Sequence, residues 1–198
     1  GLVGPNGSGK TTLLNVISGL IPLTSGQVLV HGRDTTRSAA HSLARLGIGR
    51  TFQTPRVFEA MTIWENLEIG ADLRQAEAGR RLLALLEPYR AEWASNHPDL
   101  MAHAQRRVLE VLRVVASDAD ILLLDEPAAG LSPEERRGFA DLLVFLRDRL
   151  GKTILLVEHD LHLVWRVADR ISVLDTGRIV AEGPPDVIAA DPKVRALF

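Results

Sequence analysis

Residues 4–11, GPNGSGKT, have the residue types and the spacing of a loop that binds phosphate groups. Glycines let consecutive backbone N–H groups turn toward phosphate oxygens, the lysine reaches the β and γ phosphates of a nucleotide, and the threonine hydroxyl is a ligand for Mg²⁺. The candidate nucleotide-binding residues here are Gly4, Pro5, Asn6, Gly7, Ser8, Gly9, Lys10, Thr11 and Thr12. A helix expected over residues 11–18 would turn its positive end toward the anion and stop at Gly19.

Chemistry is also expected where two apolar runs end. Asp125 and Glu126 follow ILLL at residues 121–124, and His159 ends the run ILLVEH. A carboxylate at such a strand end can hold Mg²⁺ through water, and a second acid can orient or deprotonate the attacking water. We therefore interpret Asp125 as a metal ligand, Glu126 as catalytic, and His159 as a hydrogen-bond donor to a γ phosphate. The alternatives are a solvated strand end for the two acids and a structural role for the histidine.

The elements that must position these residues alternate along the chain. Short apolar runs bounded by turns alternate with amphipathic stretches, which is typical of an α/β fold with a parallel sheet wrapped by helices. Residues 121–124 and 153–157 are almost wholly apolar and are expected at the centre of the sheet. Further strands are expected at residues 27–30, at residues 47–50, and in a hairpin formed by residues 170–174 and 178–181.

Two helix starts are marked by capping boxes, in which glutamate follows a hydroxyl residue by three positions. The boxes are Thr62 with Glu65 and Ser132 with Glu135, the second followed by Pro133 at the first helical position. Residues 74–90 are expected to form an amphipathic helix as far as Pro88, with its arginines on a solvated face. Any second lobe is expected as an insertion at about residues 54–116.

The composition limits the classes of function. With 198 residues, 46% of them hydrophobic, the chain suits one globular domain. A formal net charge of -2 gives no field for broad binding to nucleic acid or a bilayer, and the lack of cysteine excludes thiolate metal sites and cysteine nucleophiles. No apolar run approaches the roughly 18 residues of a membrane span. Only Leu2 and Val3 precede the loop, too few for a central strand of about five residues, so we expect a fragment.

Five motifs stand in order along the chain. They are residues 4–11, GRTFQ at 49–53, ILLLDEP at 121–127, AGLS at 129–132 and EHD at 158–160. This set resembles the Walker A, Q-loop, Walker B, D-loop and H-loop motifs of ABC-type ATPases. The segments around the motifs, such as GRTFQTPRVFEAMTIWENL and DEPAAGLSPEE, are similar to those of the ATP-binding subunits of branched-chain amino acid importers.

The resemblance implies a P-loop NTPase with a mainly parallel central sheet and an inserted helical subdomain. Residues 1–198 would be one nucleotide-binding domain that lacks its N-terminal strands. ATP and Mg²⁺ would be its ligands, with Gln53 sensing both the Mg²⁺ and the attacking water. The partners would be a second ABC ATPase subunit, identical or different, transmembrane permease subunits and, indirectly, a periplasmic or extracellular solute-binding protein, but no nucleic acid. Such a chain would work at the cytoplasmic face of the membrane.

The signature segment departs from the family pattern. The family's LSGGQ aligns with MAHAQ at residues 101–105, so the resemblance implies that Ala102, His103, Ala104 and Gln105 contact the nucleotide of the partner subunit. The serine hydroxyl is missing at Ala102, and the methyl group of Ala104 replaces a glycine that allows close backbone approach. The family also has an aromatic residue that stacks on adenine upstream of the phosphate loop, and we expect that region to be absent.

Three functions stay open. The first is the ATP-hydrolysing subunit of an importer, for branched-chain amino acids or similar small polar solutes. The second is a non-catalytic nucleotide-binding partner in an asymmetric ABC heterodimer, which the altered signature favours and the presence of Glu126 and His159 opposes. The third is an ABC ATPase of the DNA-repair type, whose long insertion does not fit within residues 54–116. The identity of the transported solute is not set by this chain.

Overall fold

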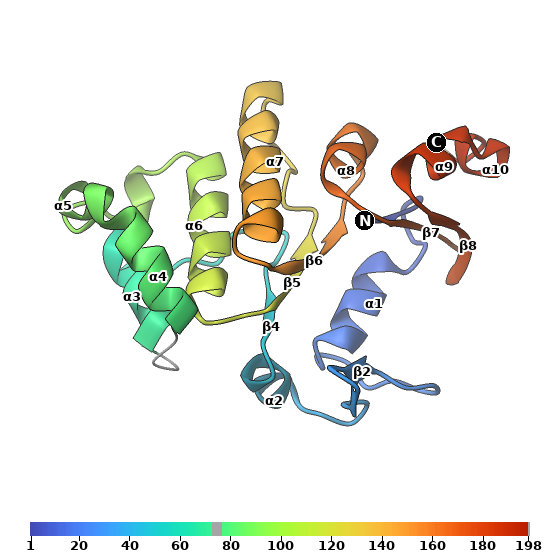
Figure 1. Ribbon diagram of the computed structural model, residues 1–198, viewed down its shortest axis with the longest axis horizontal. Helices are drawn as coiled ribbons and strands as arrows, with labels where there is room; N and C mark the ends of the chain where they lie inside the picture. Colours follow the sequence, from blue (N-terminus) through green and yellow to red (C-terminus); the bar gives the residue numbers. More distant parts are fainter. Residues whose placement is uncertain (73–76, 198) are drawn as a thin grey trace.

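The strands form a sheet with the N-terminal strand near its middle. The computed structural model describes residues 1–72 and 77–197, and within them a six-stranded sheet has the order β4-β5-β6-β1-β7-β8 (Figure 1). The strands are β1 (Leu2–Val3), β4 (Ile48–Arg50), β5 (Ile121–Asp125), β6 (Thr153–Val157), β7 (Ile171–Asp175) and β8 (Arg178–Gly183). Neighbouring strands are parallel except β7 and β8, which form the predicted antiparallel hairpin. The expectation of a mainly parallel sheet is confirmed.

β1 is short but fully incorporated into the sheet. Leu2 pairs with Val157 of β6 and with Ser172 of β7, and Val3 pairs with Val173. β1 takes a central place with only two residues, because strands on both sides supply hydrogen-bond partners to this buried segment. The phosphate loop therefore follows directly from a strand at the centre of the sheet.

The side chains of β5 alternate between two buried faces. Leu122 and Leu124 belong to the core cluster that includes Phe139, whereas Leu123 belongs to the cluster that includes Leu14 on the other face. Alternate residues of a strand point to opposite faces, so a strand covered on both sides needs an unbroken apolar run. This is why ILLL reads as a central strand.

Helices cover both faces of the sheet (Figure 1). One face carries α7 (Pro133–Asp148) and α8 (Leu161–Val167), and the other carries α1 (Lys10–Ile17) and α2 (Ala40–Arg45). Two short helices, α9 (Pro185–Ala190) and α10 (Pro192–Arg195), follow β8. α1 ends at Ile17 and Gly19 has a left-handed φ of 68°, as expected from the glycine.

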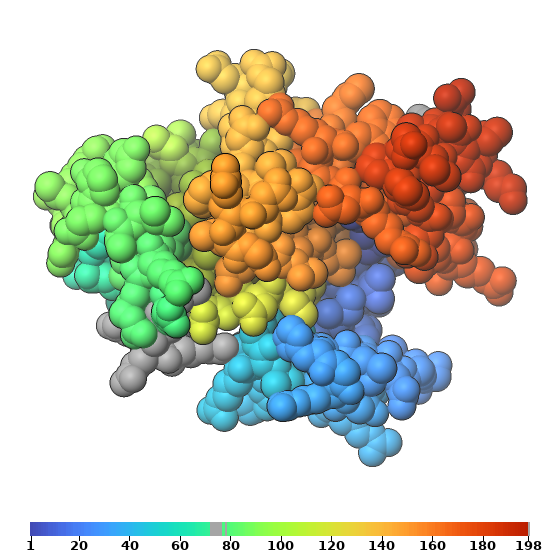
Figure 2. All heavy atoms as spheres, in the orientation of Figure 1, coloured from blue at the N-terminus to red at the C-terminus, as the bar shows by residue number. Residues whose placement is uncertain are grey.

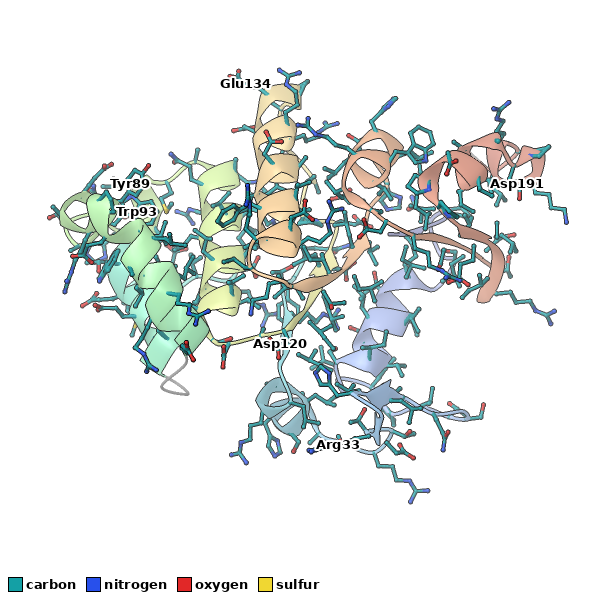
Figure 3. The ribbon with its side chains drawn as sticks, viewed as in Figure 1. Arg33, Tyr89, Trp93, Asp120, Glu134 and Asp191 are labelled. Carbon is teal, nitrogen blue, oxygen red and sulfur yellow. The ribbon has the colours of Figure 1, made fainter. Side chains whose placement is uncertain are left out.

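The helices between β4 and β5 lie together at one side of the sheet, and we call them the helical lobe (Figures 1 and 2). They are α3 (Ile63–Asp72), α4 (Glu77–Leu86), the 3₁₀ turn η1 (Glu87–Tyr89), α5 (Arg90–Trp93), the 3₁₀ turn η2 (Pro98–Leu100) and α6 (His103–Ala116). Of the helix expected over residues 74–90, residues 74–76 lie outside the described part, and the α-helix ends before the turn that contains Pro88. The rings of Tyr89 and Trp93, which Figure 3 places in the lobe, stack with 5.3 Å between centroids.

Both predicted capping boxes are present. The Thr62 amide donates to Glu65 Oε2 at 2.8 Å, and the Glu65 amide donates back to Thr62 Oγ1 at 3.2 Å. The Ser132 amide donates to Glu135 Oε2 at 2.8 Å, and the Glu135 amide donates back to Ser132 Oγ at 3.2 Å. These bonds satisfy amides that have no partner within the first turn of a helix.

The strand expected at residues 27–30 is shorter than predicted and lies outside the main sheet. β2 (Leu29–Val30) pairs antiparallel with β3 (Arg33–Asp34) in a separate two-stranded sheet. The chain reverses at once because His31 and Gly32 both have left-handed φ values, 50° and 73°. Apolar periodicity predicts a strand here but not its partner.

Candidate active site

The phosphate loop, residues 4–9, connects β1 to α1, and its first residue must be glycine. Gly4 has a φ of 151°, and a Cβ atom built on it would lie 2.0 Å from the main-chain oxygen of Leu174 in β7. No side chain fits at that distance. The close contact fixes where the loop leaves the sheet, so that the N-terminal end of α1 follows directly.

Lys10, the first residue of α1, folds back over the loop. Its Nζ donates to the main-chain oxygens of Gly4 at 2.8 Å and Pro5 at 3.0 Å. Burial lowers the pKa of Lys10, while the nearby carboxylates of Glu126 and Asp125 act to raise it. Within the described part of the chain, the buried hydroxyl of Ser8 has no hydrogen-bond partner. A cation and a free hydroxyl donor in one loop suit a phosphate group.

Asp125, at the end of β5, is held from two sides. Its Oδ1 accepts from Thr11 Oγ1 at 3.4 Å, and its Oδ2 lies 3.5 Å from the Arg50 guanidinium, which also donates to Ser18 Oγ at 2.7 Å. Burial raises the pKa of Asp125, and the charge of Arg50 acts in the opposite direction. The hydroxyl of Thr11 and the carboxylate of Asp125 are the oxygen ligands that Mg²⁺ prefers, so this pair fits that ion.

Glu126 and His159 lie in direct contact. Glu126 Oε1 and His159 Nε2 are 2.6 Å apart and form a hydrogen bond between the ends of β5 and β6. Glu126 has a φ of 48°, a left-handed value that turns the chain sharply as it leaves β5. Glu158 is buried, and its carboxylate accepts from the amides of Ala128 at 2.7 Å and His159 at 3.2 Å. These bonds tie the two strand ends together.

Of the six side chains expected to act on the γ phosphate, the Mg²⁺ or the attacking water, the structure brings five together and leaves Gln53 apart. Contacts at the carboxyl ends of the strands bring together Lys10, Thr11, Asp125, Glu126 and His159. Gln53 is exposed in the segment between β4 and α3, and among the described residues its side chain makes no hydrogen bond to that cluster.

Arg50 and Glu158 are site residues that sequence reasoning missed. Their side-chain partners, Asp125 and the Ala128 amide, lie far away in the sequence. Glu158 directly precedes the predicted His159, and Arg50 lies within the GRTFQ motif. Their positions inside these two motifs were the only features of the sequence that pointed to a role in the site.

The signature segment forms the start of α6. Ala102 caps the helix, and its amide donates to Gln105 Oε1 at 2.8 Å. His103 is exposed, and a Cβ atom built on Gly130 would lie 3.9 Å from its ring. Ala104 lies within the helix, so it does not have the left-handed backbone of a glycine; it packs against the core. The methyl group at position 104 therefore causes no backbone strain.

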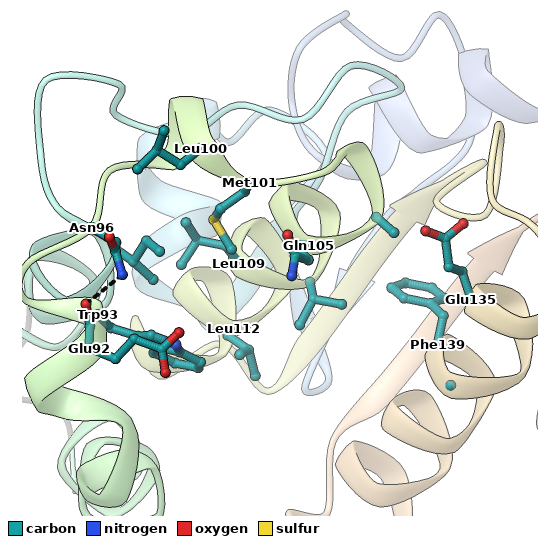
Figure 4. Close-up of a pocket in the computed structure, with 14 residues that line it drawn as sticks. Glu92, Trp93, Asn96, Leu100, Met101, Gln105, Leu109, Leu112, Glu135 and Phe139 are labelled. Atoms are coloured by element: carbon teal, nitrogen blue, oxygen red, sulfur yellow. Dashed lines mark hydrogen bonds between the residues drawn. The ribbon is translucent and has the colours of Figure 1, made fainter.

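A cavity of about 470 Å³ separates the signature segment from α7 (Figure 4). Met101, Ala104 and Gln105 line it on one side, and Glu135 and Phe139 line it on the other. Its walls are mostly apolar, which sets it apart from the polar phosphate loop.

A family model described as ABC transporter matches residues 1–129. The chain belongs to the ABC transporter family. The high-affinity branched-chain amino acid transport ATP-binding protein LivG of Escherichia coli (strain K12) is 36% identical over 98% of this chain and 83% of its own length. The sulfate/thiosulfate import ATP-binding protein CysA of Methylococcus capsulatus (strain ATCC 33009 / NCIMB 11132 / Bath) is 37% identical over 96% of this chain and 56% of its own length.

Solved structures of ABC ATPases have the same fold. The ADP conformation of MJ1267, an ATP-binding cassette of an ABC transporter, matches with a TM-score of 0.83 and 30% identity over 99% of this chain and 85% of that one. The dimeric post-hydrolysis state of the cassette MJ0796, bound to ADP and Pi, matches with a TM-score of 0.74 and 26% identity over 93% and 84%. This chain is an ATP-binding subunit of an ABC transporter, an ATPase coupled to transport. No helix within the described residues is long and apolar enough to cross a membrane.

Proposed function

We propose that this chain hydrolyses ATP at the cytoplasmic face of a membrane and drives the import of branched-chain amino acids or similarly small polar solutes. The observation that carries the proposal is the cluster of contacts at the ends of β1, β5 and β6, where Lys10, Asp125, Glu126 and His159 meet. Ligands of open α/β sheets bind at this edge. The amino acid solute is proposed from the likeness to LivG.

Each residue of the cluster has a proposed role. Lys10 exchanges its bonds to the Gly4 and Pro5 oxygens for bonds to the β and γ phosphates of ATP. Thr11 and Asp125 would hold Mg²⁺, which would neutralise phosphate charge when bound. Gly7, Gly9 and Thr12 are also proposed to contact phosphate, as are Asn6 and Ser8.

Water activation is assigned to the pair of Glu126 and His159. The Glu126 carboxylate orients the attacking water and accepts its proton. Before ATP binds, the 2.6 Å bond to His159 Nε2 holds that carboxylate in place. Since Nε2 carries at most one hydrogen, His159 would exchange this bond for one to the γ phosphate when ATP is bound. Gln53, on a segment outside the cluster, would be a further ligand of Mg²⁺ and would contact the attacking water.

The partners are a second ABC ATPase subunit, identical or different, and the permease subunits. In the dimer, Ala102, His103, Ala104 and Gln105 face the partner's nucleotide from the N-terminal end of α6. Phe58 is 44% exposed just past Gln53, and we assign it to the surface that contacts the permease. A solute-binding protein outside the membrane acts through the permease.

Two substitutions test the catalytic assignment. Glu126→Gln keeps the loop and Lys10, so ATP should still bind, while kcat falls by about 10²–10⁴-fold because the general base is lost. Lys10→Ala should weaken ATP binding itself, by at least about 10-fold in Kd, because charge-assisted bonds to phosphate are lost. Binding is measured by titration calorimetry and hydrolysis by phosphate release from the assembled transporter.

Glu134→Gln is a matched control, since Glu134 is exposed in the first turn of α7. It should hydrolyse ATP like the parent. Parental hydrolysis by Glu126→Gln would remove Glu126 from the mechanism. Stimulation of hydrolysis by leucine with its binding protein, but not by sulfate, supports the amino acid solute, and the reverse result refutes it.

A second candidate function is the non-catalytic partner in an asymmetric heterodimer. It is favoured by the two alanines of the signature segment, since Ala102 offers no hydroxyl to the partner's phosphate. The contact between Glu126 and His159 opposes it, because a non-catalytic site needs no such pair.

A further inference from the structure

A buried ion pair in the helical lobe holds the main chain around Gln53. Arg107 and Glu110 are 0% and 1% exposed, one turn apart on α6, and Arg107 Nη1 lies 2.9 Å from Glu110 Oε2. Charged side chains are rarely buried this completely unless they bind specific partners. Their remaining partners lie in the segment between β4 and α3, more than 50 residues earlier in the chain.

The pair contacts four main-chain groups of that segment. Arg107 Nη1 donates to the Phe52 oxygen, and Arg107 Nη2 donates to the Gln53 oxygen. Glu110 Oε1 accepts from the Arg56 amide at 3.1 Å and from the Phe52 amide at 3.4 Å. Residues 52–58 form neither helix nor strand, so side chains of α6 replace the ladder that would otherwise bind these groups.

Two further contacts extend the attachment along α6. Arg113 Nη2 donates to the Arg56 oxygen at 2.5 Å, and its guanidinium lies 4.7 Å from the centroid of the Phe58 ring. Upstream, the Thr51 amide donates to the Leu123 oxygen at 3.0 Å, which fixes the other end of the segment to β5. The Gln53 side chain is thus exposed on a main chain that is held by α6 on one side and by the sheet on the other.

We propose that Arg107 and Glu110 are positioning residues that set the place of Gln53 in the active site and couple it to the signature segment. α6 starts with the signature residue His103, and Arg107 lies one turn further along the same helix. A movement of α6 that follows contact with the partner's nucleotide therefore carries the Gln53 main chain with it. The inference rests on the proposed role of Gln53 in hydrolysis.

A purely stabilising role does not account for this arrangement. Buried ion pairs are often no more stabilising than apolar residues of similar volume, because desolvation offsets their attraction. Apolar residues would fill the same space but would leave the four loop groups without partners. The arrangement is suited to fixing geometry.

The test uses Arg107→Lys and Glu110→Gln in the full chain, assembled with its partners. Lysine keeps the positive charge but lacks the planar guanidinium that lets Arg107 reach two carbonyl oxygens and Glu110 at once. Glutamine keeps the shape of Glu110 but leaves Arg107 without its counter-charge. Because misplacement of a catalytic group by about 1 Å costs on the order of 100-fold in rate, kcat should fall by roughly 10- to 100-fold in both variants, with KM for ATP nearly unchanged. Arg106 also lies on α6, and it forms a partly exposed ion pair with Glu59; Arg106→Lys is therefore the matched control and should keep the parental kcat.

Combination with Gln53→Ala separates positioning from general damage. If the pair acts through Gln53, Arg107→Lys should cause little further loss of kcat in the Gln53→Ala background, whereas independent losses would multiply. Multiplying losses overturn the inference. If Gln53→Ala alone leaves kcat unchanged, the role of Gln53 in the proposed function fails instead.

Hydrogen exchange tests the attachment independently of catalysis. The amides of Phe52 and Arg56 should exchange faster in Glu110→Gln than in the parent and in Arg106→Lys, because their acceptor is weakened. Unchanged exchange at both amides overturns the proposed attachment even if ATP hydrolysis is altered. If Arg107→Lys does not fold, the kcat measurements and the hydrogen exchange are both made with the Glu110→Gln variant.

Discussion

The substitution Gly4→Ala isolates the contact that fixes the phosphate loop to the sheet. The added methyl carbon would lie 2.0 Å from Leu174 O, where contacts of a Cβ atom start at about 3.0 Å, so the main chain must move by about 1 Å. The Gly4 main chain and the Leu174 oxygen both lie in the backbone of the packed sheet, so no flexible side chain can absorb the movement.

The expected loss of stability has two parts. Overpacking of a buried site costs about 1–3 kcal/mol. A non-glycine residue at the φ of 151° adds strain of about 1–3 kcal/mol. The free energy of unfolding should therefore fall by about 2–6 kcal/mol, a large part of the roughly 5–15 kcal/mol available to a domain.

Two other glycines separate the parts of this effect. Gly151 has a φ of 63° and no atom within 4 Å of its built Cβ, so Gly151→Ala should show backbone strain alone, about 1–2 kcal/mol. Gly138 lies in α7 with equally open surroundings, so Gly138→Ala should stabilise the helix by about 0.5–1 kcal/mol. Urea unfolding followed by far-ultraviolet circular dichroism gives all three values.

The order of the three variants is the decisive result. We expect Gly138→Ala to be the most stable, Gly151→Ala to be intermediate and Gly4→Ala to be the least stable, with equal m-values. If Gly4→Ala unfolds at the same urea concentration as Gly151→Ala, the contact with Leu174 O is not rigid and the reasoning about the loop is refuted.

Two further predictions concern the signature segment and α7. Ala102→Ser together with Ala104→Gly should raise the single-turnover hydrolysis rate of the homodimer, by up to about 100-fold if the present signature misplaces the phosphate by about 1 Å; an unchanged rate means that MAHAQ is already competent. Hydrogen bonds from the Ser132 amide and hydroxyl hold the pKa of Glu135 below its ordinary value. A lowered pKa stabilises the fold above the ordinary value of about 4.3 and loses this contribution as the pH falls through the folded pKa. The difference in Tm between the parent and Glu135→Gln should therefore be constant near neutral pH and shrink in acid, with Glu134→Gln as the control; a difference that is equally large in acid contradicts this explanation.

The sequence was sufficient for the residues that sit at strand ends. Asp125, Glu126 and His159 follow apolar runs, and the carboxyl ends of parallel strands meet at one edge, so their proximity follows from the pattern of strands. The capping boxes of α3 and α7 were also predictable, because both partners lie within one turn. Local chemistry and a simple topology account for these successes.

Contacts between distant segments were not predictable in the same way. Nothing in the sequence around Arg50 indicates that its guanidinium faces Asp125, and the spacing of Arg107 and Glu110 on α6 reads equally well as a surface ion pair. Their burial depends on how the helical lobe packs beside the segment after β4. The prediction for residues 27–30 missed the pairing of the strand for a related reason. The left-handed residues His31 and Gly32 turn the chain back at once, so β2 pairs with β3 outside the main sheet.

The position of β1 in the sheet determines when the active site can assemble. Residue 2 pairs with residues 157 and 172, so β1 can find its neighbours only after more than 150 further residues have been synthesised. Contacts so distant in sequence close slowly, because a long loop must be ordered before they form. The phosphate loop is therefore synthesised well before it can take its final shape, because that shape depends on the pairing of β1.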